Sequence, residues 1–167
     1  MDVVTVSAVA GNARPCIRPA GAGDVGRLLS LMKLLAEEEG LATSLQADAQ
    51  SLLRDGFGPS PKFRVLLAQV EAEAVAYLSY TVGYSIWAGG SMLLLDDLFV
   101  VRAWRGRGIG RSLLDSARRI CVAQSHIQAR WTVELRNRAA IRFRLTEAPL
   151  EALATRSAAR LPEWRTG

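Results

Sequence analysis

The sequence predicts a single α/β domain with a mixed, mostly antiparallel sheet flanked by helices. Three observations support this. The 167 residues suit one domain, and half of them are hydrophobic, which is enough to build a core. The apolar periodicity also changes along the chain in the order strand, two helices, three strands, helix, strand, helix, strand. We expect the domain to span residues 13–157, between a flexible N-terminus (residues 1–12) and a C-terminal tail (residues 158–167).

The first third of the chain predicts one strand and two helices. Residues 13–20, "ARPCIRPA", are expected to form a short edge strand, because prolines are tolerated there. Asp24 is placed to cap a helix over residues 25–39, which Gly40 would end. A second helix is expected over residues 45–54, before the loop "DGFGPSP".

The remainder predicts five strands and two more helices. "KFRVLLAQV", "EAVAYLSYTVGYSI" and "SMLLLDDLFVV" are strand-like and are separated by the turns "EAE" and "WAGG". A helix that runs to about Ala123 would bury Ile109, Leu113, Leu114, Ala117, Ile120 and Cys121. A strand over residues 128–135, a short helix over 137–145 and a weak strand over 150–157 complete the prediction.

The net charge of +5 leaves nucleic-acid binding open, because nearly all positive residues are arginines crowded into the second half. The sequence has no aromatic-interleaved basic strand, no helix-turn-helix pattern and no zinc spacing. A single phosphorylated small molecule explains a local arginine cluster equally well. We therefore expect no nucleic-acid partner.

The cysteine and hydropathy patterns favour a cytoplasmic protein without a metal. No apolar run approaches the ~20 residues that span a bilayer, and we expect neither a signal peptide nor membrane association. Cys16 and Cys121 lack metal-like spacing and are expected to be buried thiols in a reducing compartment. The only histidine, His126, is expected to face solvent between a helix and a strand.

The stretch "RGRGIGRS" fails two phosphate-binding motifs and fits a third. A Walker A loop would need glycine where Arg105 stands and lysine where Arg111 stands. A dinucleotide fingerprint would need its third glycine at Arg111 and an acid near Arg130. What remains is Arg105-x-x-Gly108-x-Gly110, directly after a strand. Glycines there let main-chain N–H groups at a helix start approach an anion such as pyrophosphate.

This pattern resembles the R/Q-x-x-G-x-G/A signature of the GNAT acetyltransferases. "LLLDDLFVVRAWRGRGIG" has the strand, elbow and helix of that family in register, and the resemblance extends over residues 14–156. Within the superfamily, "YSIWAG" followed by "LLLDDLFV" resembles the diamine (spermidine/spermine) acetyltransferase group, and "WTVELRNRAAIRF" resembles its downstream segment. The resemblance implies a GNAT-like fold and a homodimer.

The resemblance also implies acetyl-CoA as cosubstrate and direct acetyl transfer to the primary amine of a small cationic substrate. That substrate would be a polyamine or an amino-acid-like amine. Main-chain N–H groups of residues 98–100 would polarise the thioester carbonyl, and the glycine loop would hold the pyrophosphate. The implied cofactor-binding residues are Leu98, Phe99, Val100, Arg105, Gly106, Arg107, Gly108, Ile109, Gly110, Arg111 and Asn137.

Asp96 and Asp97 are the candidate acids. Charges within an apolar strand cost several kcal/mol if buried unpaired, so they either serve a site or pair with a neighbouring arginine. Because neighbours on a strand point to opposite faces, at most one is expected to aim into a given site. Either could take the amine's proton or hold the cationic substrate, with Tyr84 and Trp87 lining the substrate pocket; Trp87 could equally be an ordinary hairpin aromatic.

One departure from the family concerns the general acid. Counting from Asn137, the family's tyrosine position holds Arg144, and Glu147 replaces the glycine that usually follows. Arginine stays protonated and is a poor proton donor, but it could stabilise a departing thiolate by charge or bind a CoA phosphate. A CoA-binding pseudoenzyme is therefore the alternative function, and a nucleic-acid-binding module is a more distant one.

Overall fold

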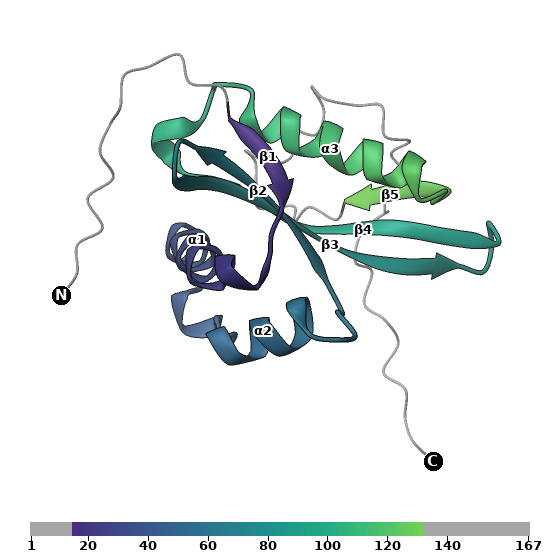
Figure 1. The fold of residues 1–167 in the computed structure, drawn as a ribbon, viewed down its shortest axis with the longest axis horizontal. Coiled ribbons are helices and arrows are strands. Elements are labelled where there is room, and N and C mark those ends of the chain that lie inside the picture. The colour runs from purple at the N-terminus through teal and green to yellow at the C-terminus, as the bar shows by residue number, and fades with distance from the viewer. Residues whose placement is uncertain (1–14, 132–167) are drawn as a thin grey trace.

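A computed structural model describes residues 15–131 and shows a sheet with helices on both faces (Figure 1). Within these residues the sheet has five strands in the order β1-β2-β3-β4-β5. The first three pairings are antiparallel and β4 pairs with β5 in parallel. The predicted mixed, mostly antiparallel sheet is confirmed. The strands are β1 (Cys16–Pro19), β2 (Arg64–Val70), β3 (Glu73–Ser85), β4 (Gly90–Val100) and β5 (Gln128–Trp131).

Two hydrophobic cores lie on opposite faces of the sheet, one under α3 (Ile109–Ala123) and one under α1 (Val25–Glu38) and α2 (Ala49–Phe57) (Figure 1). Successive residues of one strand pack into different cores: Leu66 lies in the core under α3 and Leu67 in the core under α1 and α2. The six inward positions predicted for α3 are confirmed, five of them being buried and Ile120 packed half-buried against the same core.

The α1 helix ends as expected, whereas the bounds of α2 differ. Gly40 follows α1 with a φ of +70°, a conformation that glycine adopts without strain. The α2 helix begins at Ala49 rather than near residue 45, because the Asp48 carboxylate accepts a hydrogen bond of 2.7 Å from Ser51 N–H and caps it there. It also continues into the first three residues of the predicted loop and ends at Phe57. Short 3-10 turns precede α1 (Ala22–Asp24), precede α2 (Ala42–Ser44) and follow β4 (Arg102–Trp104).

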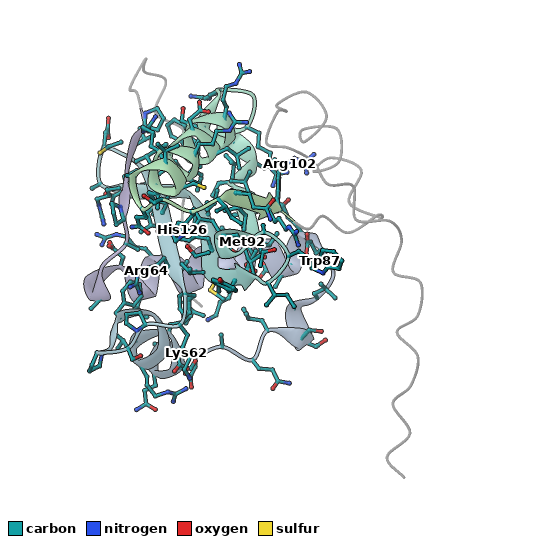
Figure 2. All side chains as sticks on the ribbon, turned by 90° about the vertical axis from the view of Figure 1, so that its right-hand side faces the viewer. Lys62, Arg64, Trp87, Met92, Arg102 and His126 are labelled. Atoms are coloured by element: carbon teal, nitrogen blue, oxygen red, sulfur yellow. The ribbon has the colours of Figure 1, made fainter. Side chains whose placement is uncertain are left out.

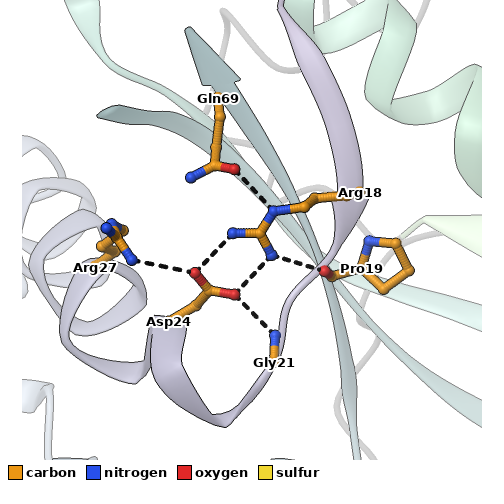
Figure 3. A network of polar contacts seen from close by, with 6 residues as sticks. All are labelled: Arg18, Pro19, Gly21, Asp24, Arg27 and Gln69. Atoms are coloured by element: carbon orange, nitrogen blue, oxygen red, sulfur yellow. Dashed lines mark hydrogen bonds and ion pairs between the residues drawn. The ribbon is translucent and has the colours of Figure 1, made fainter. Parts of the chain in front are cut away.

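Asp24 precedes α1, but its side chain does not cap that helix as the sequence predicted (Figure 3). The carboxylate accepts two hydrogen bonds from Arg18, of 2.7 and 2.8 Å, and one from Gly21 N–H. Arg18 also donates to Gln69, and Arg27 lies 3.4 Å from the same carboxylate. The Arg18 hydrogen bonds, with help from Gly21, lower the pKa of Asp24 to about 2. The ion pair between Arg18 and Asp24 therefore connects β1 with the start of α1, and the hydrogen bond from Arg18 to Gln69 connects β1 with β2.

The outcomes for the cysteines and the histidine are mixed. Cys121 is buried as predicted, but Cys16 is exposed, because it lies at the start of the edge strand β1. His126 is half-buried rather than solvent-facing, since its Nδ1 lies 2.7 Å from Ser91 Oγ.

Over residues 15–131, no helix is long and apolar enough to cross a membrane. Within the same residues, no three His, Cys, Asp or Glu side chains gather as a metal site would require.

The remaining predicted elements lie wholly or partly outside the described residues. The strand predicted over 128–135 is described as far as Trp131. The helix over 137–145, the strand over 150–157 and both terminal segments fall outside residues 15–131.

Candidate active site

The strand β4 contains a bulge at its two acids. Leu98 pairs with Leu78 and Leu95 pairs with Tyr80, so that Asp96 and Asp97 together face one residue of β3, Ser79. Two residues opposite one define a β-bulge, a feature that re-aims side chains and interrupts the ladder.

The bulge places both acids on the same face of the sheet. Leu95, before the bulge, and Leu98, after it, both pack against the core under α3. Because side chains alternate on either side of the bulge, Asp96 and Asp97 both fall on the opposite face, toward α1 and α2. The expectation that the two acids point to opposite faces is therefore wrong, since the inserted residue resets the alternation.

Asp97 is the more enclosed of the two acids. Its Oδ2 accepts hydrogen bonds of 3.4 Å from the Tyr77 hydroxyl and from the Ser79 hydroxyl. Burial raises the pKa of Asp97, and these two hydrogen bonds offset part of that rise. Asp96 is exposed, and the pKa of its carboxyl is raised by partial desolvation and by the Asp97 charge. Neither acid forms an ion pair with an arginine within the described chain.

Beyond the bulge, one edge of β4 carries main-chain N–H groups that no described strand covers. The β4–β5 pairing spans Met92–Leu95 only. On the β3 side, Val101 N–H donates to Val75 O. Because successive N–H groups of a strand point to alternate sides, those of Leu98 and Val100 point to the uncovered side. The main chain there has two N–H groups free of β3, those of Leu98 and Val100, whereas Phe99 N–H points toward β3; the role that the family resemblance implies for residues 98–100 stays a prediction.

The uncovered edge leads into the glycine loop. Gly106 and Gly108 have φ angles of +76° and +77°, and, apart from the adjoining residues, no described atom lies within 4 Å of where a Cβ would stand at either residue. Gly108 is the N-cap of α3 and supplies no side-chain cap. The first intrahelical hydrogen bond runs from Ser112 N–H to Gly108 O, so earlier N–H groups have no helical acceptor. An open cradle at a helix start suits an anion.

The side chain of Arg105, the first arginine of the motif, contacts both β4 and α1. Arg105 Nε donates to Val100 O at 2.8 Å and Nη2 donates to Glu38 at 2.6 Å. Its guanidinium also lies 5.7 Å from the centre of the Phe99 ring. In this arrangement the side chain of Arg105 links the loop to the end of β4 and to α1. Arg107 packs over the buried Trp104 indole at 4.6 Å.

We expect Arg105 to affect CoA binding through Glu38. Arg105→Ala and Glu38→Gln should each weaken CoA binding by about three-fold, because an exposed ion pair contributes little. The double variant should lose no more than Arg105→Ala alone, since that change already removes the contact with Glu38. Calorimetric titration with CoA measures the three affinities, and fully additive losses would show that Arg105 acts independently of Glu38.

The predicted substrate-pocket aromatics are not near the acids within one chain. Tyr84 pairs with Ser91, five strand positions from Ser79, which corresponds to about 16 Å. Trp87 is 97% exposed in the turn between β3 and β4 (Figure 2). Asn137 and Arg144 lie outside the described residues.

Sequence reasoning missed the two hydroxyls beside Asp97. The position of Ser79 could have been predicted, because regular antiparallel pairing of the two strands on either side of the "WAGG" turn places it opposite the acids. Tyr77 reads as an ordinary apolar strand residue, and only the pairing of β3 with β4 reveals its contact.

Comparison with known proteins identifies the family. Residues 28–144 match the acetyltransferase (GNAT) family. The chain is 32% identical over 142 residues to a spermidine/spermine N(1)-acetyltransferase-like protein of Homo sapiens, which covers 81% of this chain but 20% of that protein. It is 31% identical over 125 residues to the thialysine N-epsilon-acetyltransferase of Bos taurus, which covers 70% of this chain and 73% of the relative. This chain thus spans about a fifth of the human relative's length.

Solved structures agree on the fold. An aminoglycoside acetyltransferase from an uncultured soil metagenomic sample, in complex with sisomicin, has a TM-score of 0.73 at 18% identity, over 88% of this chain and 96% of that one. A ribosomal-protein-alanine N-acetyltransferase from Brucella melitensis has a TM-score of 0.69 at 17% identity, over 89% and 98%. With the bulged strand, the glycine loop and the family match in agreement, the chain belongs to the acetyltransferase (GNAT) family.

Proposed function

We propose that the protein transfers the acetyl group of acetyl-CoA to the primary amine of a small cationic substrate, a polyamine or an amino-acid-like amine. The observation that carries this proposal is the bulge, because it brings two acids to one face beside the uncovered edge of β4. Acetyl-CoA is the cosubstrate of the family, and the open glycine loop fits its pyrophosphate.

In the proposed reaction the protein's main chain holds the acyl donor. N–H groups of residues 107–111 bind the pyrophosphate, and the N–H groups of Leu98 and Val100 donate to the thioester oxygen as negative charge develops on it. No acyl-enzyme forms, because neither Cys16 nor Cys121 lies at this edge: one is on β1 and the other is in the core under α3.

Asp97 is proposed to take the proton of the amine. A primary ammonium has a pKa of about 10.4, so on the order of one molecule in a thousand is neutral at pH 7. Asp97 takes one proton from the ammonium, directly or through a water. The neutral nitrogen attacks the carbonyl carbon, the carbon–sulfur bond breaks, and CoA leaves as a thiolate that takes up the second proton lost by the nitrogen. The raised pKa of Asp97 makes its carboxylate a stronger base than an exposed one. Exposed Asp96 would hold the substrate's positive charge.

An acetyl-CoA consumption screen against a panel of amines tests this function. We expect turnover with polyamines or lysine-like amines and none with neutral amines of similar size. A parallel titration with CoA alone reports on the loop. CoA binding without turnover of any amine would support the pseudoenzyme alternative, and absence of CoA binding would exclude both functions.

Arg144→Tyr tests the departure from the family. If the site lacks only its general acid, the substitution should raise kcat by about 10²-fold or more, the usual contribution of such a group. Arg142→Tyr, two residues away in the sequence, is the control and should not raise kcat. An unchanged kcat in Arg144→Tyr would show that the site works without a tyrosine acid, and the measurement is the steady-state rate with the best amine of the panel.

We further propose a homodimer, as the family resemblance implies. The end of the β3–β4 hairpin supports it, because Val82, Tyr84, Ile86 and Trp87 are all exposed apolar or aromatic side chains there. Sedimentation velocity should show a dimer at micromolar concentration, and Trp87→Ser should shift it toward monomer. A monomer at the highest concentration reached would contradict the proposal.

A further inference from the structure

Ser79 makes two contacts with the same acid. Its hydroxyl oxygen accepts a hydrogen bond of 3.0 Å from Asp97 N–H and also lies 3.4 Å from Asp97 Oδ2. A serine hydroxyl has one hydrogen to donate and two lone pairs to accept with. It can therefore receive the N–H and donate to the carboxylate at the same time. We propose that Ser79 is a positioning residue that holds the β4 bulge and orients the Asp97 carboxylate for proton transfer.

The bulge in β4 requires a hydrogen-bond acceptor for a main-chain N–H group that the strand ladder does not supply. Asp96 and Asp97 share one opposing residue, so a main-chain N–H at this point leaves the regular ladder. A partly enclosed N–H without an acceptor is costly, and proteins almost always supply one. Ser79, the residue directly opposite, supplies it with its side chain. Alanine at position 79 would leave the Asp97 N–H without that acceptor, and the register of β4 at the bulge would be less firmly fixed.

The carboxylate is oriented by two hydroxyls acting on one of its oxygens. Tyr77, which is 1% exposed, donates to Oδ2 from the same face of β3 as Ser79. No residue of the described chain hydrogen-bonds to Oδ1. Both donors are neutral hydroxyls, so they restrain the carboxylate without removing its charge. Oδ1 is then the oxygen that receives the proton, and both hydroxyls favour the ionised form.

The inference rests on the proposed function for the role of the proton, but its geometry can be tested without turnover. Four variants suffice. Ser79→Ala removes the hydroxyl, Ser79→Thr retains it on a residue that suits a strand, and Tyr77→Phe removes the second donor. Thr81→Val is the matched control, because it removes a hydroxyl two residues along the same face, which makes no hydrogen bond to Asp97. Thermal unfolding verifies that each variant is folded.

Carbon-13 NMR of aspartate-labelled protein, with the Asp97 signal identified by its loss in Asp97→Asn, reports the carboxyl titration directly. In Ser79→Ala and Tyr77→Phe the pKa of Asp97 should rise above its wild-type value, whereas Ser79→Thr and Thr81→Val should titrate like wild type. Exchange of the Asp97 amide should be faster in Ser79→Ala alone. An Asp97 that titrates and exchanges in Ser79→Ala as in wild type would overturn the proposal.

The kinetic arm separates this inference from the proposed function. With the best amine, Ser79→Ala should lower kcat at pH 7 by about three- to ten-fold, the size of one hydrogen bond, with CoA affinity unchanged. The acid limb of the pH–rate profile should move to higher pH, and Ser79→Thr should restore it. A shifted NMR titration with no turnover in wild type would sustain the positioning and refute the proposed function. A merely structural role would lower the rate without moving the limb.

Discussion

Gly108→Val is expected to lower the affinity for CoA by about 100-fold or more while the protein stays folded. Gly108 has a φ of +77°, and a Cβ at this position would meet no described atom beyond the adjoining residues, so the β carbon of valine would not collide with the rest of the protein. It would instead strain the backbone, at a cost of about 1–3 kcal/mol for a residue in this region, and about 2.7 kcal/mol corresponds to 100-fold in affinity. The loop would rearrange, and its N–H groups would no longer converge on a phosphate. Calorimetric titration with CoA gives the affinity.

Gly40→Val is the matched control for this effect. Gly40 has nearly the same backbone conformation, with a φ of +70° and open space around it, but it lies at the end of α1. Both variants should lose similar stability in thermal unfolding, and only Gly108→Val should lose CoA binding. Wild-type CoA affinity in a folded Gly108→Val protein would refute the assignment of the loop.

Asp97→Asn is expected to lower kcat/KM for the amine by about 10²- to 10⁴-fold, the range for loss of a general base. Wild-type activity should fall as the pH falls through the raised pKa of Asp97, because the protonated carboxyl cannot accept a proton. In Asp97→Asn this acid limb should disappear. Asp96→Asn should instead raise KM for the amine by about ten-fold with little change in kcat, as expected for loss of one exposed charge contact.

Asp115→Asn provides the control for removing a charge. Asp115 pairs with Arg118 on the surface of α3, away from the bulge, and its loss should leave both parameters unchanged. If Asp96→Asn and Asp97→Asn both behave like wild type on the best amine, the two acids are structural. The cationic substrate class would then lose its main support.

The parts of the fold that depend on local pattern could be predicted from the sequence. The α3 helix and its inward face follow from apolar spacing within fifteen residues, and the glycine loop follows from residue types that few other structures require. The residues at which helices begin and end were harder to predict from the sequence. The start of α2 depends on whether Asp48 or an earlier residue caps it, and the composition of the segment does not decide between them.

The site itself depended on long-range pairing that periodicity does not report. Strict alternation predicts opposite directions for Asp96 and Asp97, and the bulge that reverses this exists only because β4 pairs with β3 on both sides of it. The Arg105–Glu38 contact is a similar case, since the two residues are 67 positions apart in the chain. Residue types indicated the candidate chemistry, and the sheet register showed which of the described groups meet.

The central claim is direct acetyl transfer to an amine from acetyl-CoA held in the glycine loop. A single-turnover experiment with isotope-labelled acetyl-CoA, quenched at intervals and analysed by mass spectrometry of both protein and small molecules, tests it most directly. The account predicts that the label moves to the N-acetylated amine at the rate at which CoA appears, while the protein mass never increases by an acetyl group. Label that passes first through an acetylated protein, or that stays on CoA in a fully bound complex with every amine, would contradict it.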